Sequence, residues 1–351
     1  MICTDEQLSD LLEELRSAQW VALDTEADSL HAYPEKLCLI QVCTEAGARL
    51  VDPLSGIKLG PLLTALLKHE LIVHGGDYDL RLLRRHHEFV PDRVFDTMLA
   101  ARLLGHRKFG LADLLKHYLG ITLEKGSQKA NWAKRPLTER MERYALADVQ
   151  YLKPLSDRLK HELIEKGRLG WLEESCARLI ADCAQPKTPN ADSAWRLKGS
   201  ARLDRRGLAV LRELWHWREK EALAANKPPY FILSHELLVA IAAAAADSGR
   251  VKQLVPNWYS CRRRNGLFKA VARALALPPD QQPEPVPQGS IALNDGERAR
   301  FEELKRRRDA RAAQLGIDPA LIASKQTLVR LARSWHQHAP DLMSWQRELL
   351  A

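Results

Sequence analysis

Short runs of apolar residues in the first third of the chain constrain its fold more than any other feature. They cover residues 20–23, 37–42, 49–51 and 71–73, and each is too short to be a helix in a globular core. We therefore expect them to be strands of one sheet. The loops between the middle runs are short, so those strands can pair as antiparallel hairpins.

Patterns typical of amphipathic helices lie before, between and after these strands. A capped helix is predicted to begin at Thr4 or Asp5, because apolar residues then recur at helical spacing. The later helical patterns cover residues 59–67, 78–87, 97–104, 111–118 and 137–160. Strands and helices in this order predict a mixed α/β domain.

The strand pattern ends at about residue 155, and the rest of the chain is predicted to be helical. Two segments rich in proline and polar residues interrupt it, 184-AQPKTPNADS-193 and 277-LPPDQQPEPVPQGS-290. We expect an α/β domain at 1–183, a linker at 184–193, a helical domain at 194–275, a proline-rich linker at 276–290 and a helical segment at 291–351.

Composition and charge indicate the class of partner. The 351 residues are enough for two or three domains. Lysine and arginine total 53 against 45 acids, and the net charge of +8 favours a polyanion such as nucleic acid. Six cysteines without a C-x-x-C pair, an acidic N-terminal segment and no long apolar run predict a soluble, cytoplasmic protein with reduced thiols and no membrane association.

Two acids follow the first apolar run, in 21-VALDTEADSL-30. Alternate residues of a strand project from the same face, so Asp24 and Glu26 point together at the expected strand end. Carboxylates that close resist ionisation unless a cation lies between them, and Mg²⁺ prefers carboxylates with water and phosphate oxygens. Taken alone, the pair fits either a metal site or a solvated strand end.

Three more polar residues occupy predicted helices. In 139-ERMERYALADVQYL-152, Tyr144 and Asp148 are four residues apart and share a helix face, either as a functional pair or as a surface pair. In 71-LIVHGGDYDLRLLRRH-86, a strand runs into a helix. Asp77 is expected to be the N-cap of that helix, and Asp79 lies in its first turn, where the helix dipole favours negative charge.

The order of these motifs resembles the DEDD exonuclease superfamily, in its tyrosine-bearing branch, and is most similar to the ribonuclease D family. The other branch has histidine five residues before the last aspartate, where this chain has Arg143. The resemblance also covers 36-KLCLIQV-42, 51-VDPL-54, 94-VFDTMLAARLLG-105, 110-GLADLLKHYLG-120 and 131-NWAKRPLTERMERYALADVQYL-152. It implies a ribonuclease H-like mixed sheet for the first domain.

The resemblance also implies a catalytic set: Asp24, Glu26, Asp79 and Asp148 as metal carboxylates, and Tyr144 as the residue that positions the attacking water. Two divalent ions, Mg²⁺ or Mn²⁺, are the implied cofactors, and such pairs of ions suit phosphodiester hydrolysis. Many members have an aromatic residue directly after the acid pair, where this chain has Ala27. His31 and Tyr33 either stack on the terminal nucleotide instead or complete the loop.

A basic segment, 124-EKGSQKANWAKRPL-137, precedes the helix that carries Tyr144. Its candidate RNA-binding residues are Gln128, Lys129, Lys134 and Arg135, which suit phosphate contacts beside a single-strand site. A solvated loop anchored by buried Trp132 is the alternative. Asp52 and Asp96, near other strand ends, are expected to be turn or helix N-cap residues.

The helical part resembles the HRDC domain, a module that accompanies ribonuclease D and often binds nucleic acid. The likeness is strongest in 208-LAVLRELWHWREKEALAANKPPYFILSHELL-238, where Ser234 is expected to be an N-cap. Leu211 and Trp215 are expected in its core. The segment 291–351 looks like a second, more diverged copy.

These features together predict a metal-dependent 3′-to-5′ exoribonuclease that trims single-stranded 3′ ends of structured RNA, such as tRNA precursors. Two-metal-ion hydrolysis would release nucleoside 5′-monophosphates. No obligatory protein partner is inferred. The alternatives are a nucleic-acid-binding protein without catalysis and a DNA 3′-5′ exonuclease of the same superfamily.

Overall fold

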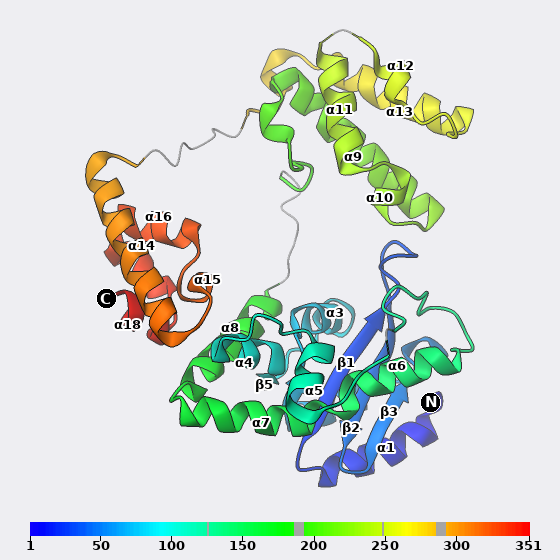
Figure 1. Ribbon diagram of the computed structural model, residues 1–351. Coiled ribbons are helices and arrows are strands. Elements are labelled where there is room, and N and C mark those ends of the chain that lie inside the picture. The colour runs from blue at the N-terminus through cyan, green and yellow to red at the C-terminus, as the bar shows by residue number, and fades with distance from the viewer. Residues whose placement is uncertain (125, 186–192, 248, 286–292) are drawn as a thin grey trace. The chain divides into compact units, whose positions relative to one another are not determined.

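Residues 1–124, 126–185, 193–247, 249–285 and 293–351 are described by the computed structural model in Figure 1. The chain divides into two compact units. The first comprises Met1–Asp28, Lys36–Pro186 and Ile291–Ala351, and the second comprises Ser29–Glu35 and Lys187–Ser290. Lys125, residues 186–192 of the first predicted linker and residues 286–290 of the second lie outside the described residues. No described helix is long and apolar enough to cross a membrane.

A five-stranded sheet forms the centre of the first unit. Its strands are β1 (Val21–Ala27), β2 (Leu37–Thr44), β3 (Gly47–Val51), β4 (Glu70–Val73) and β5 (Arg93–Asp96), in the order β3-β2-β1-β4-β5. The first three strands are antiparallel, whereas β4 and β5 run parallel to β1. The mixed sheet and its hairpins are confirmed. The fifth strand, β5, was not predicted, because only two of its four residues, Val94 and Phe95, are apolar.

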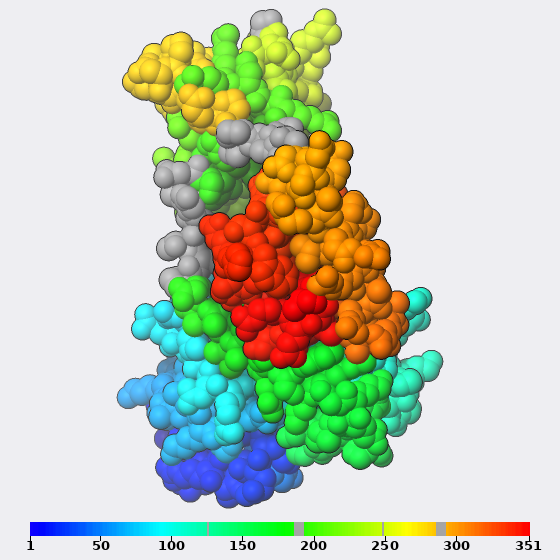
Figure 2. All heavy atoms as spheres, turned by 90° about the vertical axis from the view of Figure 1, so that its left-hand side faces the viewer, coloured from blue at the N-terminus to red at the C-terminus, as the bar shows by residue number. Residues whose placement is uncertain are grey.

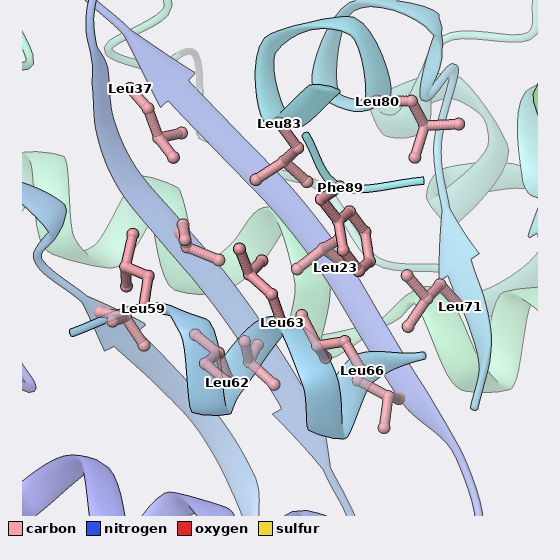
Figure 3. Packing of buried hydrophobic residues seen from close by; sticks show 14 of the residues in the cluster. Leu23, Leu37, Leu59, Leu62, Leu63, Leu66, Leu71, Leu80, Leu83 and Phe89 are labelled. Carbon is pink, nitrogen blue, oxygen red and sulfur yellow. The ribbon is translucent and has the colours of Figure 1, made fainter. Parts of the chain in front are cut away.

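Helices cover both faces of this sheet. One face packs against α1 (Asp5–Ser17), α2 (Gly60–Leu66) and α3 (Asp77–His87), and Figure 3 shows the leucines of α2 and α3 meeting those of β1 and β4. The other face packs against α6 (Glu139–Gln150) and α7 (Leu152–Glu165). Thr4 is the N-cap of α1, as expected, and accepts a hydrogen bond from the Gln7 amide.

The single helix expected over 137–160 is two helices. The first, α6, ends at Gln150, and α7 begins at Leu152 after Tyr151, which has φ −107° and ψ 1°. Pro154 explains the break, because it has no amide to donate to the Gln150 carbonyl and its ring would clash with that group. The prediction of one continuous helix was therefore wrong.

The C-terminal segment packs against the first unit, as Figure 2 shows for the residues coloured orange and red. It contains α14 (Asp295–Leu315), α15 (Pro319–Ile322), α16 (Lys325–Arg333), α17 (Trp335–His338) and α18 (Ser344–Leu350). Their apolar residues share a hydrophobic cluster with α4 (Thr97–Leu104), α5 (Leu111–Leu119), α7 and α8 (Leu169–Ala184). A second HRDC-like module at 291–351 remains a sequence prediction.

Two side chains, Arg168 and Trp171, hold this segment in place. The buried guanidinium of Arg168 donates to the carbonyls of Leu103, at 2.7 Å, and Leu315, at 2.8 Å. Trp171 of α8 stacks on Trp345 of α18, with ring centroids 4.9 Å apart. The segment therefore shares both core and polar contacts with the sheet-bearing unit.

The second unit is built around α9 (Arg205–Ala225). It also contains α10 (Pro229–Ile232), α11 (His235–Ala246), α12 (Val251–Leu254) and α13 (Cys261–Leu275). Leu211 is fully buried and Trp215 partly buried in its core, and Ser234 caps α11, as expected. Tyr33, from the loop after β1, groups with this unit, where its hydroxyl donates to Glu219 at 2.5 Å.

Candidate active site

The acid pair lies within β1 and not at its end. The strand continues to Ala27 because β2 pairs with it in antiparallel register, Asp24 opposite Gln41 and Glu26 opposite Leu39. Asp24 and Glu26 project from the face covered by α6, since Ala22, which shares their side of the strand, packs there against Val149. The predicted common orientation of the two acids holds, but the predicted strand end was wrong.

Asp79 approaches β1 from its other edge. Strand β4 pairs with β1 only at Val21 and Ala22, so the later residues of β1 have no strand on that side. The first turn of α3 fills the gap, and the Asp79 carboxylate accepts hydrogen bonds from the Thr25 amide, at 3.1 Å, and the Thr25 hydroxyl, at 2.5 Å. Asp79 is thereby fixed next to the acid pair.

The start of α3 depends on two glycines and a buried aspartate. Gly76, and not Asp77, is the N-cap, and Asp77 pairs with Arg81 one turn later. Asp96 accepts hydrogen bonds from the amides of Gly75 and Gly76, each at 3.0 Å, and it is also the N-cap of α4. The expectation for Asp96 is confirmed and that for Asp77 was wrong.

Tyr144 and Asp148 lie on α6, which packs against the same face of the sheet as Asp24 and Glu26. Ala145 and Val149 of α6 are fully buried against β1 and β2, which fixes the rotation of the helix. One oxygen of each of Asp24, Glu26 and Asp148 lies within 4.8 Å of the others, a spacing that suits a shared divalent cation. The side chain of Tyr144 hydrogen-bonds to Asp148.

Burial and mutual repulsion raise the pKa values of these acids, as expected for a carboxylate cluster suited to a cation. Burial and the carboxylates of Asp148 and Asp79 raise the pKa of Glu26 to about 9. Burial raises the pKa of Asp148 to about 7, although its hydrogen bond with Tyr144 opposes the rise. Burial also raises the pKa of Asp79 to about 6 and that of Asp24 well above its usual range, the latter helped by the neighbouring acids. Such a set ionises fully only with positive charge nearby.

The five residues predicted as catalytic thus converge on one place from β1, α3 and α6. Carboxylate oxygens are the ligands that Mg²⁺ and Mn²⁺ prefer. Raised pKa values are expected when several such carboxylates lie close together and no cation offsets their charge. Asp24, Glu26 and Asp148 could hold such an ion. Asp79 already has two protein donors and lies beside them.

Sequence reasoning missed Gln41. It lies on the fully buried strand β2, directly opposite Asp24, and neither polar atom of its side chain has a hydrogen-bond partner among the described residues. Leu39 and Cys43, two residues away on either side, share its face and are apolar and buried. A polar residue inside the apolar run 37–42 was the available signal.

The residues of the basic loop 124–137 differ in what they contact. The Arg135 guanidinium pairs with both oxygens of Asp52, at 2.5 and 2.6 Å, and also donates to the Cys38 carbonyl. These bonds attach the loop to the sheet and occupy the donors of Arg135. We therefore do not include Arg135 among the proposed RNA contacts. Trp132 is 1% exposed, which confirms that it anchors the loop. Asp52 is also the N-cap expected, of the short turn Pro53–Ser55.

Gln128 lies next to the site. Its side chain hydrogen-bonds to Tyr144, and a Cβ atom on the neighbouring Gly126 would lie 1.6 Å from the Tyr144 ring. The loop therefore packs closely against Tyr144. A cavity of about 190 Å³, bordered by Tyr144, Asp148 and Arg143, opens beside it.

Comparison with known proteins gives this geometry a family. Residues 1–164 match the 3′-5′ exonuclease family, and residues 207–249 match the HRDC domain family. Ribonuclease D of Zymomonas mobilis is 31% identical over 358 residues, covering 99% of this chain and 91% of the relative. Ribonuclease D of Cronobacter turicensis is 32% identical over 364 residues, covering 100% and 97%. The chain belongs to the ribonuclease D family.

Solved structures agree. Escherichia coli RNase D, described as an exoribonuclease involved in structured RNA processing, matches with a TM-score of 0.78 at 28% identity, covering 100% of this chain and 96% of that one. A protein from Bifidobacterium adolescentis matches with a TM-score of 0.84 at 24% identity, which supports the fold. The ribonuclease D assignment identifies the chain as a 3′-5′ exoribonuclease of a superfamily that uses divalent metals.

Proposed function

We propose that this protein hydrolyses RNA one nucleotide at a time from single-stranded 3′ ends of structured RNA, such as tRNA precursors, and releases nucleoside 5′-monophosphates. The convergence of Asp24, Glu26 and Asp148 oxygens within 4.8 Å, beside Asp79 and Tyr144, carries the proposal. Four acids suffice for two ions, Mg²⁺ or Mn²⁺. We place the enzyme in the cytoplasm, acting without an obligatory protein partner.

Each residue has a distinct role in this proposal. Asp24, Glu26 and Asp148 would hold the divalent ions through their clustered carboxylate oxygens. Asp79, held by Thr25, completes the set at the edge of β1. When bound, the divalent ions lower the pKa of the attacking water and stabilise charge on the leaving oxygen. The side chains fix where that water and the scissile phosphate lie.

Tyr144 acts as a hydrogen-bond donor. Burial and the nearby carboxylates of Asp148 and Glu26 raise the pKa of its phenol above the usual range, so it stays protonated at neutral pH. It cannot take a proton from water under these conditions. Held between Gln128 and Asp148, its hydroxyl is suited to orient the attacking water in line with the phosphate.

The surrounding surface suits RNA. Gln128, Lys129 and Lys134 lie on the loop beside Tyr144 and are proposed to contact the backbone of the 3′ end. The HRDC unit exposes Tyr230, Phe231 and Trp258 by more than half of their surface, which suits stacking on unpaired bases. We propose that it holds the body of the RNA.

The decisive experiment follows 5′-end-labelled and 3′-end-labelled single-stranded RNA on a gel with Mg²⁺, with Mn²⁺ and with EDTA. The native protein should shorten 5′-labelled RNA stepwise and release the 3′ label at once as a mononucleotide, only with metal. Asp24→Asn should bind the RNA without shortening it, whereas Asp10→Asn, on exposed α1, should behave as the native protein. Binding without shortening by the native protein would favour the binding-only alternative, and preference for DNA would favour the DNA exonuclease.

A further inference from the structure

A second concave region lies at the opposite end of the sheet from the acids. It is a cavity of about 970 Å³ in the first unit, bordered by the starts of β1, β4 and β5 and by α1, α2 and α7. We refer to it as the Lys68 cavity, after one of its lining residues. Since a strand rises about 3.3 Å per residue, Trp20 at its border lies about 13–20 Å from Asp24 and Glu26. It is therefore separate from the carboxylate site.

Three cations from different elements line this cavity without an anionic partner. Lys68 follows α2, Arg93 begins β5 and Lys160 lies on α7. All three are exposed, and none has an ion pair or a side-chain hydrogen bond in the part of the chain that the structure describes. Lone surface lysines are common, but three converging on one cavity create a local positive potential that attracts anions.

The other charged groups of the cavity do not cancel this potential. Lys153 pairs with Asp157 across one helical turn, and Arg16 pairs with Glu13 outside the cavity. Glu70 is the remaining carboxylate. Because Arg16 and Lys153 are paired, three cations remain against Glu70, which lies opposite Arg93 in the register of β4 and β5, and the net excess is two positive charges.

The cavity also offers an aromatic surface. Trp20, immediately before β1, is partly exposed and contributes to the lining. Positive charge beside an accessible aromatic ring is the combination that binds single-stranded nucleic acid, in which phosphates meet the cations and a base stacks on the ring. A site for a metal ion or a cationic ligand would require the opposite sign of charge.

We propose that the Lys68 cavity is a second RNA site, which binds backbone phosphates of the substrate strand away from the 3′ end that enters the carboxylate site. The proposal deepens the proposed function, since it takes RNA as the substrate. Its three unpaired cations match about three phosphates. RNA too short to reach both sites would gain nothing from it, whereas longer RNA would be bound more tightly.

The test measures RNA binding in the Asp24→Asn background, so that the RNA stays intact. Lys68→Ala, Arg93→Ala and Lys160→Ala are combined. The matched control combines Lys58→Ala, Lys116→Ala and Arg298→Ala, which remove the same charge from exposed positions of the first unit outside the cavity. Affinity is measured by fluorescence anisotropy over a series of salt concentrations, with RNA of about 4 and about 20 nucleotides.

For the longer RNA, the cavity variant should bind at least about 10-fold more weakly than the control. Its slope of log affinity against log salt should be lower by about 2, because each lost phosphate contact on a single strand contributes about 0.7. The shorter RNA should bind both variants equally. When the three cavity substitutions are made in the protein that keeps Asp24, KM for long RNA should rise and kcat should not change.

Equal affinities and slopes for the cavity variant and its control would overturn the proposal. A second result would also overturn it. If calorimetry shows that adenosine 5′-monophosphate binds only when the three cations are present, while the affinity for long RNA does not depend on them, the cavity is a site for free nucleotides. Failure of the proposed function looks different, because the native protein would not shorten RNA of any length.

Discussion

The clustered acids should make the protein less stable than its fold allows, and the substitution Asp148→Asn tests this. Asp148 has an ordinary pKa of 3.8, which burial raises to about 7 in the folded protein. Between these two pH values the folded state binds more protons at Asp148 than the unfolded state does. The contribution of Asp148 to the free energy of unfolding is therefore greatest below about pH 4 and falls as the pH rises to 7. Above pH 7 the loss is complete.

The shift sets the size of the effect. A rise of about three pKa units corresponds to about 4 kcal/mol at pH 8, as an upper limit. Asp148 is partly exposed, so we halve this to about 2 kcal/mol for solvent screening. Asparagine keeps the shape and can still accept the hydrogen bond of Tyr144. The variant should therefore be more stable than the native protein at pH 8 without metal, and equal to it at pH 4.

Calorimetry of the full chain in EDTA measures this difference. The transition that Mg²⁺ shifts upward in the native protein identifies the unit with the acids. Its midpoint should rise by about 4–8 °C in Asp148→Asn at pH 8, and the response to Mg²⁺ should shrink. Asp10→Asn, an exposed change on α1, is the control. A variant that is less stable at pH 8, or stabilised equally at both pH values, would refute the reasoning.

Four further outcomes are expected. Tyr144→Phe should lower kcat by about 100-fold with RNA affinity unchanged in a binding assay, and an equal loss of both would contradict water positioning. The Mg²⁺ concentration for half-maximal activity should fall between pH 6 and 8, because Glu26 and Asp148 must lose protons to bind metal; a constant value would argue against these ligands. Arg168→Met should reduce stability in urea by about 3–5 kcal/mol because two buried carbonyls lose a charged donor, a loss that an exposed arginine such as Arg178 should not reproduce. Gln41→Leu should raise stability by about 1–2 kcal/mol, since its amide is buried without a partner, and a fall would reveal that an ordered water pairs it.

Local patterns predicted much of this protein. The alternation of apolar and polar residues in β1 gave the shared orientation of Asp24 and Glu26, and helical spacing gave that of Tyr144 and Asp148. Both patterns depend on covalent geometry that holds wherever such an element forms. The strands and their antiparallel hairpins followed from the short apolar runs and short loops, whereas the mixed sheet was implied by the family resemblance.

Features that depend on distant partners were not predictable from these patterns. Strand β1 extends past Leu23 through the acids because β2 pairs with it, which no local pattern reports. Arg135 was expected to contact phosphate, but Asp52, 83 residues earlier, engages it. The helix break at Tyr151 could have been predicted, because the sequence contains Pro154 and proline disrupts the preceding turn of any helix.

The sheet-bearing unit is discontinuous in the chain, and this bears on how it is synthesised. Its last packing surfaces, including Trp345 against Trp171, belong to residues made after the whole HRDC unit. On a ribosome, the apolar side of α4 and α8 therefore stays uncovered while more than 100 further residues emerge, counting from Pro186 to Ile291. The nascent chain therefore contains all the residues of the sheet and the acid cluster before the C-terminal helices that pack against this unit have been made. Folding of the unit is complete only when those helices have docked.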